Sequence, residues 1–125
     1  MEITLLDTNV LIEILKGNEL TVQMVESFSH TAISAITVME LYYGALNKAE
    51  LKQLEKFVAL FRVVHLDEQI SIKSEHLIKT FSKSHNLDIP DSLIASTALV
   101  NGYKLFTYNI KDFRFIDDLE LVKFL

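Results

Sequence analysis

The sequence predicts an α/β sandwich built on a parallel sheet, because short apolar runs of strand type alternate with segments of helical periodicity. The chain has 125 residues, half of them hydrophobic, which is enough for one domain with its own core. Linkers, repeats and low-complexity segments are absent from the sequence, and it contains only one Pro and three Gly. We therefore expect a single domain over residues 1–125.

The first strand is expected at the opening of the chain, where an apolar run from Ile3 ends abruptly at Asp7. Thr8 and Asn9 are helix-capping types, and apolar residues repeat at helical spacing over 10–15, so a helix follows. Ligands of open parallel sheets bind beyond the carboxyl ends of the strands, which is where Asp7 falls. The alternative is that Asp7 only caps the helix.

The elements after the first helix continue the alternation. Gly17 and Asn18 make a turn, Pro90 belongs to the first turn of the last helix, and Gly102 closes that helix. Helices are expected over 20–28, 36–46, 51–60, 68–85 and 89–101, and strands over 31–34, 62–66 and 104–108, with a short fifth strand over 121–124.

Glu40 lies in the helix expected over 36–46, which is apolar almost all round. It shares one narrow stripe of that helix with Thr37, Gly44 and Asn47. Either this stripe faces water, or Glu40 is a lone carboxylate on a buried helix that needs a partner, for which a cation would serve.

Two further acidic residues, Asp88 and Asp91, lie at the start of the last helix. Asp88 is the natural N-cap, and that structural role suffices to explain it. Asp91 falls inside the first turn, on the same face as Ile94 and Ala95. It either interacts only with the helix dipole or projects a carboxylate into a site.

The strand expected over 104–108 ends like the first one, in hydroxyl, amide and carboxylate residues: Thr107, Asn109 and Asp112. Loop chemistry alone could account for Asn109 and Asp112. However, the ends of parallel strands lie at one edge of the sheet, so this cluster and Asp7 would flank a ligand-binding switch point if their strands are neighbours.

Such a group of carboxylates would select a hard cation, Mg²⁺ or Mn²⁺. The absence of Cys excludes disulfides, thiolate zinc sites and Cys nucleophiles, and the four His residues show no metal-ligand spacing. There is no signature of Ser/His/Asp catalysis and no Gly-rich phosphate loop. The net charge of −5 argues weakly against a nonspecific nucleic-acid binder, although bound divalent cations would offset it locally.

Four segments together resemble the PIN-domain family, and specifically VapC toxins of type II toxin–antitoxin modules. They are Leu6–Asn9, Ser34–Leu41, Asp91–Ala95 and Thr107–Phe113. The resemblance covers essentially the whole chain, with the motifs in the family's order and at its spacings. It implies a PIN-like three-layer sandwich, with a five-stranded parallel sheet of order 3-2-1-4-5 flanked by helices.

The resemblance also implies a Mg²⁺-dependent endoribonuclease that leaves 5′-phosphate and 3′-hydroxyl ends. Asp7, Glu40, Asp91 and Asp112 match the family's four acidic positions and are the expected catalytic and metal-binding residues. Asp7 and Asp91 are expected to hold the metal directly, while Asp112 and Glu40 complete the shell or place water. Asp88 matches no family position, which agrees with its capping role.

Substrate contacts are expected next to this site. Thr107 and Asn109 match the family's hydroxyl and amide positions, and Lys104, Lys111 and Arg114 are candidates for RNA phosphate contacts. Tyr108 stands where relatives often carry Arg or another polar residue.

The resemblance further implies a VapB-like antitoxin whose tail covers the acidic site, and a homodimer. Leu41, Tyr42 and Leu46 are the candidate dimer surface, or else part of the core. No apolar run approaches the roughly 20 residues that span a bilayer, and there is no signal peptide, so a cytoplasmic protein is expected.

Two other functions stay open at this point. A receiver-like signalling domain also gathers carboxylates around Mg²⁺, and Asp67 would then be its phosphoacceptor; Glu40 and Asp112 would remain unexplained. A catalytically silent PIN fold that binds RNA or protein is the second alternative. A silent site, however, has no physical need for four mutually repelling carboxylates.

Overall fold

β1 (Thr4–Leu6) lies inside a four-stranded sheet of order β3-β2-β1-β4 in the computed structural model, which describes residues 1–124. The three strand pairs are all parallel. The other strands are β2 (Thr31–Ser34), β3 (Arg62–Val64) and β4 (Lys104–Phe106). The helices are α1 (Thr8–Leu15), α2 (Glu19–Ser27), α3 (Ala35–Tyr43), α4 (Lys48–Val58), α5 (Glu68–His85) and α6 (Ile89–Asn101), and a 3₁₀ turn, η1, spans Ile110–Asp112.

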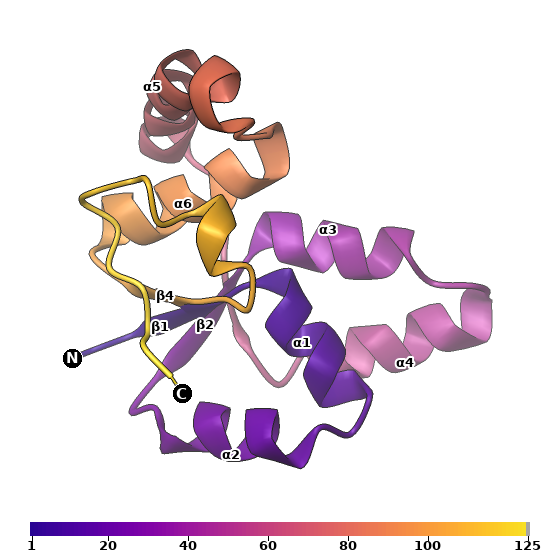
Figure 1. Ribbon diagram of the computed structural model, residues 1–125. Helices are drawn as coiled ribbons and strands as arrows, with labels where there is room; N and C mark the ends of the chain where they lie inside the picture. The colour runs from indigo at the N-terminus through magenta and orange to yellow at the C-terminus, as the bar shows by residue number, and fades with distance from the viewer. Residues whose placement is uncertain (125) are drawn as a thin grey trace.

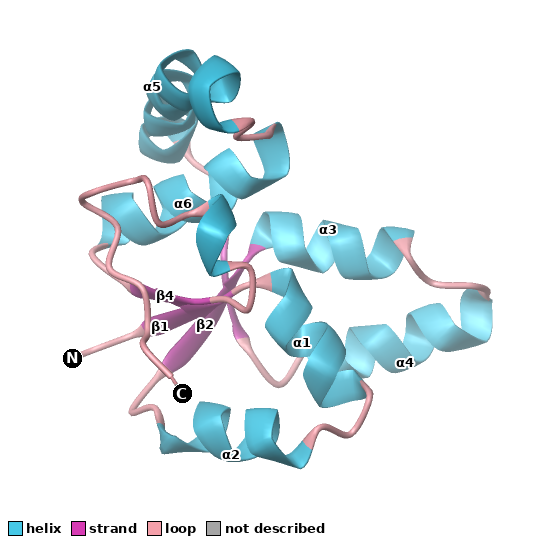
Figure 2. Ribbon diagram, viewed as in Figure 1, coloured by secondary structure: helices cyan, strands magenta, loops and turns pink. Residues whose placement is uncertain are grey.

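The sheet is buried on both faces, which makes the fold a three-layer sandwich. Neighbouring residues of β1 enter different cores: Leu5 packs with α5 and α6, whereas Leu6 packs with residues of α1, α3 and α4. Leu105 and Phe106 of β4 divide in the same way. Figures 1 and 2 show α5 and α6 together on one side of the strands, and α1, α2 and α4 on the other.

The predicted fold class, sheet order and parallel pairing are confirmed over β3-β2-β1-β4. The predicted fifth strand over 121–124 is wrong within the described residues, because only an isolated parallel bridge joins Leu105 to Leu121. The backbone there makes two bonds, from Leu105 N–H to the Glu120 carbonyl (2.9 Å) and from Val122 N–H to the Leu105 carbonyl (2.8 Å). The segment therefore takes the fifth position without forming a strand.

Helix ends follow local capping. The predicted bounds 68–85 and 89–101 are confirmed, with Asn86 and Gly102 in left-handed conformations at the C-caps. The expected helix over 36–46 instead ends at Tyr43, and the next helix begins at Lys48, because Asn47 caps α4 by accepting the Glu50 N–H at 2.9 Å. Asn47 with Glu50 is a capping-box type of spacing that the sequence already contained.

Candidate active site

Asp7 directly follows β1, and its two carboxylate oxygens have different partners. Oδ1 accepts the backbone N–H of Thr8 at 2.8 Å and so caps α1. Oδ2 accepts the Thr107 hydroxyl at 2.7 Å and the Asn9 amide at 3.1 Å. Asp7 is therefore a helix cap, as the simpler interpretation held, and also one end of a polar cluster at the carboxyl edge of the sheet.

Thr107 joins this cluster because β1 and β4 are neighbours in register, Leu6 opposite Phe106. Its hydroxyl donates to Asp7 and accepts from the Asn9 amide at 3.3 Å and from the Asn109 backbone N–H at 3.0 Å. A hydroxyl has one hydrogen and two lone pairs, so all of its hydrogen-bonding capacity is used. The geometry thus gives Thr107 a role in positioning Asp7, and a substrate contact would have to replace one of these bonds.

Glu40 is connected to Asp7 through the neighbouring residue, Thr8. The Thr8 hydroxyl donates to Glu40 Oε1 at 2.7 Å and lies 2.9 Å from the hydroxyl of Thr37, which is fully buried. Of the two interpretations of this stripe, the one with Glu40 on an otherwise buried helix is wrong, because Met39, Glu40 and Tyr43 are all exposed. α3 buries only Thr37 and Leu41, because one side of it packs on the molecule and the other faces solvent.

Asp91 lies in the first turn of α6, and Asp88 caps that helix by accepting the Asp91 N–H at 2.9 Å. The capping role predicted for Asp88 is confirmed. The Asp91 carboxylate itself receives no hydrogen bond from the described residues 1–124. Burial raises the pKa of Asp91 to about 7, with further contributions from the negative charges of Asp88, Asp7, Asp112 and Glu40.

The negative charges of Asp7, Glu40 and Asp112 each act on the pKa of Asp91, although burial is the largest cause of its rise. Burial also raises the pKa of Asp7; its bonds from Thr107, Thr8 and Asn9 oppose this, and Glu40 adds to it. Asp112, in η1, is half-buried. The arrangement concentrates negative charge at one edge of the sheet, and nearby positive charge would relieve it.

The donor set fits a hard divalent cation, because every candidate ligand is a carboxylate oxygen and the charges repel one another. Within residues 1–124, however, no three Asp, Glu or His side chains are grouped closely enough to hold a metal ion as they stand. Mg²⁺ keeps several waters and is commonly held by only one or two protein carboxylates. The carboxylate oxygens and their negative charge suit such an ion, although the side chains do not form a complete set of protein ligands.

The basic candidates have different surroundings. Lys104 forms an ion pair with Glu2 at 3.5 Å. Lys111 and Arg114 are exposed and make no ion pair with the part of the chain that the structure describes. The Asn109 side chain is exposed beside Thr107. Lys111, Arg114 and Asn109 are therefore accessible to a ligand.

Three residues that organise the site were not among the site residues predicted from the sequence: Asn9, Thr8 and Thr37. Asn9 connects the segments that follow β1 and β4. Its amide contacts Asp7 and Thr107, and its Oδ1 accepts the Tyr108 N–H at 3.1 Å. Only the side-chain geometry identifies these roles, although the run Asp7-Thr8-Asn9 places all three polar groups together.

Asp67, the phosphoacceptor required by a receiver-like site, has a different role. It caps α5 and accepts the Ile70 N–H at 2.9 Å. A helix cap at this position accounts for Asp67 without phosphoryl chemistry.

Comparison with known proteins finds relatives that match most of the chain. The family model described as "PIN domain" matches residues 4–119. Ribonuclease VapC1 of Methanocaldococcus jannaschii is 34% identical over 118 residues, which cover 94% of this chain and 83% of that protein. Among solved structures, a toxin–antitoxin complex from Klebsiella pneumoniae matches with a TM-score of 0.80 and 30% identity, covering 93% of this chain and 94% of the other. VapBC2 from Rickettsia felis, bound to a DNA fragment from its promoter, matches with a TM-score of 0.81 and 27% identity, covering 98% and 99%.

Proposed function

The chain belongs to the PIN-domain family, and on this premise we propose that it is a Mg²⁺-dependent endoribonuclease, the toxin of a VapBC-type toxin–antitoxin module. The observation that supports the proposal is the polar cluster of Asp7, Asn9 and Thr107 at the carboxyl edge of the sheet, together with the negative charges of Asp7, Glu40 and Asp112 that raise the pKa of Asp91. The likeness to ribonuclease VapC1 over 94% of the chain supports the reaction class. Mn²⁺ would suit the same oxygen ligands.

Asp7 and Asp91 would hold the cation, with Glu40 and Asp112 completing the shell or orienting water. A bound divalent cation lowers the pKa of water and offsets charge on a phosphodiester. Thr107 and Asn9 hold the Asp7 carboxylate in one orientation, and Thr8 does the same for Glu40. Lys111 and Arg114 would position the RNA backbone, and Asn109 would contact the nucleotide beside the site.

The test is cleavage of total bacterial RNA by the purified protein, with Mg²⁺ or with chelator, alongside Asp7→Asn. Discrete cleavage that requires both the metal and Asp7 is expected. Asp88→Asn is the matched control, because Asn also caps helices and Asp88 is outside the proposed ligand set. Equal cleavage by Asp7→Asn and wild type, or no cleavage of any RNA by metal-loaded wild type, would overturn the proposal.

The protein partner proposed for this chain is a VapB-like antitoxin. Solved relatives are toxin–antitoxin complexes, and a cluster of carboxylates is complementary to a basic side chain on a partner segment. Co-expression with such an antitoxin is expected to give a complex that does not cleave RNA. Asp91→Asn, which removes one negative charge, is expected to weaken the complex.

A homodimer is also proposed, through the exposed side of α3 and the segment that follows it. Leu41 is buried and Tyr42 packs against the core, so these two members of the expected surface are core residues. Tyr43 and Leu46 are 95% and 85% exposed, and Met39 is half-exposed beside them. Light scattering should give twice the monomer mass, and Tyr43→Ser with Leu46→Ser should restore the monomer.

Among residues 1–124, no helix combines the length and apolar character needed to cross a membrane.

A further inference from the structure

A cavity of about 630 Å³ opens between α1, α2 and the segment after β4, beside the carboxylate cluster. Its walls include Asn9, Glu13, Asn18, Met24, Tyr108 and Phe124. We refer to it as the α1–α2 pocket. Among the described residues its lining contains no Lys or Arg, and Glu13 is its one charged residue. The pocket therefore disfavours phosphates and carboxylates and suits a neutral or cationic group.

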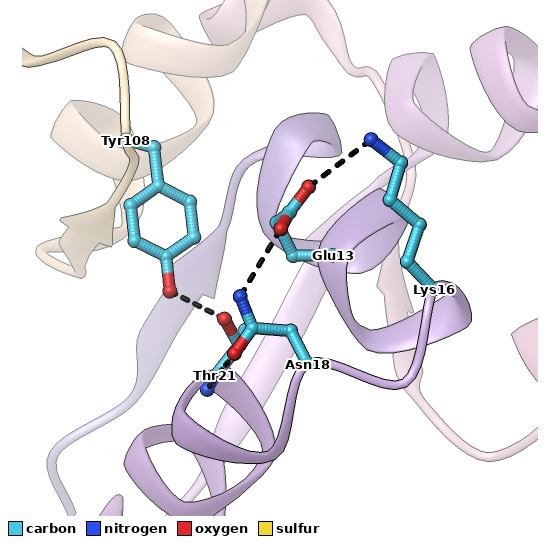
Figure 3. A network of polar contacts seen from close by, with 5 residues as sticks. All are labelled: Glu13, Lys16, Asn18, Thr21 and Tyr108. Atoms are coloured by element: carbon cyan, nitrogen blue, oxygen red, sulfur yellow. Dashed lines mark hydrogen bonds and ion pairs between the residues drawn. The ribbon is translucent and has the colours of Figure 1, made fainter.

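Tyr108 lines the pocket, and Figure 3 shows its hydroxyl pointing toward Thr21. Its hydroxyl lies 2.5 Å from that of Thr21, which is fully buried, and its backbone N–H donates to Asn9. The ring also makes edge-to-face contacts with Phe106 and Phe124, at centroid distances of 5.3 and 5.2 Å. Because the ring is already fixed, a flat ligand that stacks on it would not have to order it.

Glu13 supplies a fixed hydrogen-bond acceptor at the rim of the pocket. Its Oε1 accepts the Asn18 amide at 3.1 Å, and its Oε2 lies 3.4 Å from the Lys16 ammonium, as Figure 3 shows. Each carboxylate oxygen can accept more than one hydrogen bond, so capacity remains for a ligand. The pocket thus combines an aromatic face with an acceptor that requires N–H donors.

Asn9 connects the pocket to the carboxylates. The same side chain lines the cavity and donates to Asp7 at 3.1 Å. A group bound in the pocket therefore lies one side chain away from Asp7, next to the position that the proposed function gives to the cleaved phosphodiester.

We propose that the α1–α2 pocket receives an unpaired base of the RNA substrate, with the face of the base against Tyr108 and its N–H donors toward Glu13. This proposal rests on the proposed ribonuclease function and adds the determinant of base preference. Guanine presents two adjacent N–H donors on its pairing edge and is favoured. Uracil is disfavoured, because its one ring N–H lies between two carbonyl oxygens that a carboxylate repels.

The test measures binding of labelled pentaribonucleotides that differ only in the central base, G, A, C or U, by fluorescence anisotropy in the Asp7→Asn background. Ser27 is exposed and lines the pocket, so Ser27→Trp fills the cavity without disturbing the core. It is expected to weaken binding of the G pentamer by about fivefold to a hundredfold, the range for loss of one base stack. Ser29→Trp is the matched control: Ser29 is exposed and outside the pocket, and affinity should not change.

Glu13→Gln is the second variant, which keeps size and leaves the fold intact because Glu13 is on the surface of α1. We expect it to remove the preference for G over U while retaining affinity for U. Equal affinities of Ser27→Trp and Ser29→Trp, or an unchanged preference in Glu13→Gln, would overturn the proposal. A blocked arginine dipeptide tests the competing occupant, a cationic side chain of a protein partner. If Ser27→Trp weakens binding of the dipeptide but of none of the RNAs, the base assignment is also overturned.

These results are separable from the proposed function. Binding in the Asp7→Asn background does not depend on cleavage, so it decides the pocket even if wild type cuts no RNA. Conversely, metal-dependent cleavage whose cut-site sequences are the same in wild type and Ser27→Trp leaves the ribonuclease in place and removes the pocket.

Discussion

The carboxyl end of β1 and the first turn of α6 hold their carboxylates in opposite ways. Asp7 is 4% exposed and accepts bonds from Thr8, Asn9 and Thr107, which favour its ionised form against the cost of burial. Asp91 is half-buried without any such donor from residues 1–124, and its pKa rises to about 7. Hydrogen bonds from the protein stabilise the charge of Asp7, whereas the charge of Asp91 would need a cation from outside the protein to stabilise it. Asp7 and Asp91 therefore have different roles in the proposed site, although both are carboxylates.

The largest effect is expected at the unsupported carboxylate. Asp91→Asn should lower metal-dependent RNA cleavage by at least about a hundredfold, because it removes a proposed metal ligand and even the outer-shell partners of metal ligands contribute about ten- to a hundredfold. The measurement is single-turnover cleavage at saturating Mg²⁺. Asp88→Asn, one turn earlier, should stay within about twofold, since Asn is as good a cap as Asp. Comparable losses in the two variants would show that the start of α6 contributes to cleavage only through the fold, and not through Asp91 as a metal ligand.

A smaller loss is expected when the support of Asp7 is removed. Thr107→Val keeps the shape of the side chain but removes the donor to Asp7 and the acceptor for Asn9 and Asn109. Cleavage should fall by roughly ten- to a hundredfold, as for other outer-shell partners of metal ligands. The acidic limb of its pH profile should move to higher pH, because the Thr107 bond lowers the pKa of Asp7.

Thr97→Val is the control for this change. Thr97 is also fully buried, but its hydroxyl only donates to the Leu93 carbonyl within α6. Cleavage and pH profile should both match wild type. If Thr97→Val loses as much activity as Thr107→Val, the loss reflects packing and not the support of Asp7.

Thr8→Val should have a still smaller effect on cleavage, about three- to tenfold. The variant removes the bond to Glu40 and the contact with the buried Thr37 hydroxyl, but Glu40 is exposed and water can replace the lost hydroxyl there at modest cost. The same kinetic assay measures it. A loss as large as that of Thr107→Val would show that the site depends on the orientation of exposed Glu40 as much as on that of buried Asp7.

The smallest effect is on stability. Asp91 has a raised pKa, so the metal-free folded chain binds more protons than the unfolded chain between about pH 4 and pH 7, and stability falls as pH rises through this range. Above that range the contribution is constant. Asp91→Asn should therefore raise the Tm at pH 8 and leave it nearly unchanged at pH 4; each 1 kcal/mol that survives solvent screening is worth about 4 °C. Mg²⁺ should stabilise wild type more than the variant at pH 8; an unchanged Tm at pH 8 in the variant would contradict the role of burial.

How far the sequence predicts the molecule depends on the range of the interaction concerned. Asp88 and Pro90 define the start of α6 by local capping rules, and the prediction there is correct to the residue. The meeting of Asp7 with Thr107 requires β1 and β4 to be neighbours, which strand periodicity alone does not determine and the family resemblance supplied. The Thr8–Thr37–Glu40 contacts could not be predicted, because they depend on how α1 and α3 are placed. The solvent exposure of α3 could not be predicted for the same reason, because its apolar sequence does not indicate which side of the helix packs against the rest of the protein.

The backbone bonds of Leu105 with Glu120 and Val122 have a consequence for association. β4 is the last strand of the sheet, and an uncovered outer strand offers its N–H and carbonyl groups to strands of other chains. The segment over 120–122 occupies those groups at Leu105, with bonds of 2.9 and 2.8 Å. If these two bonds were lost, the outer side of β4 would be open to strands of other chains. The two bonds therefore protect this edge of the sheet against aggregation through strand addition.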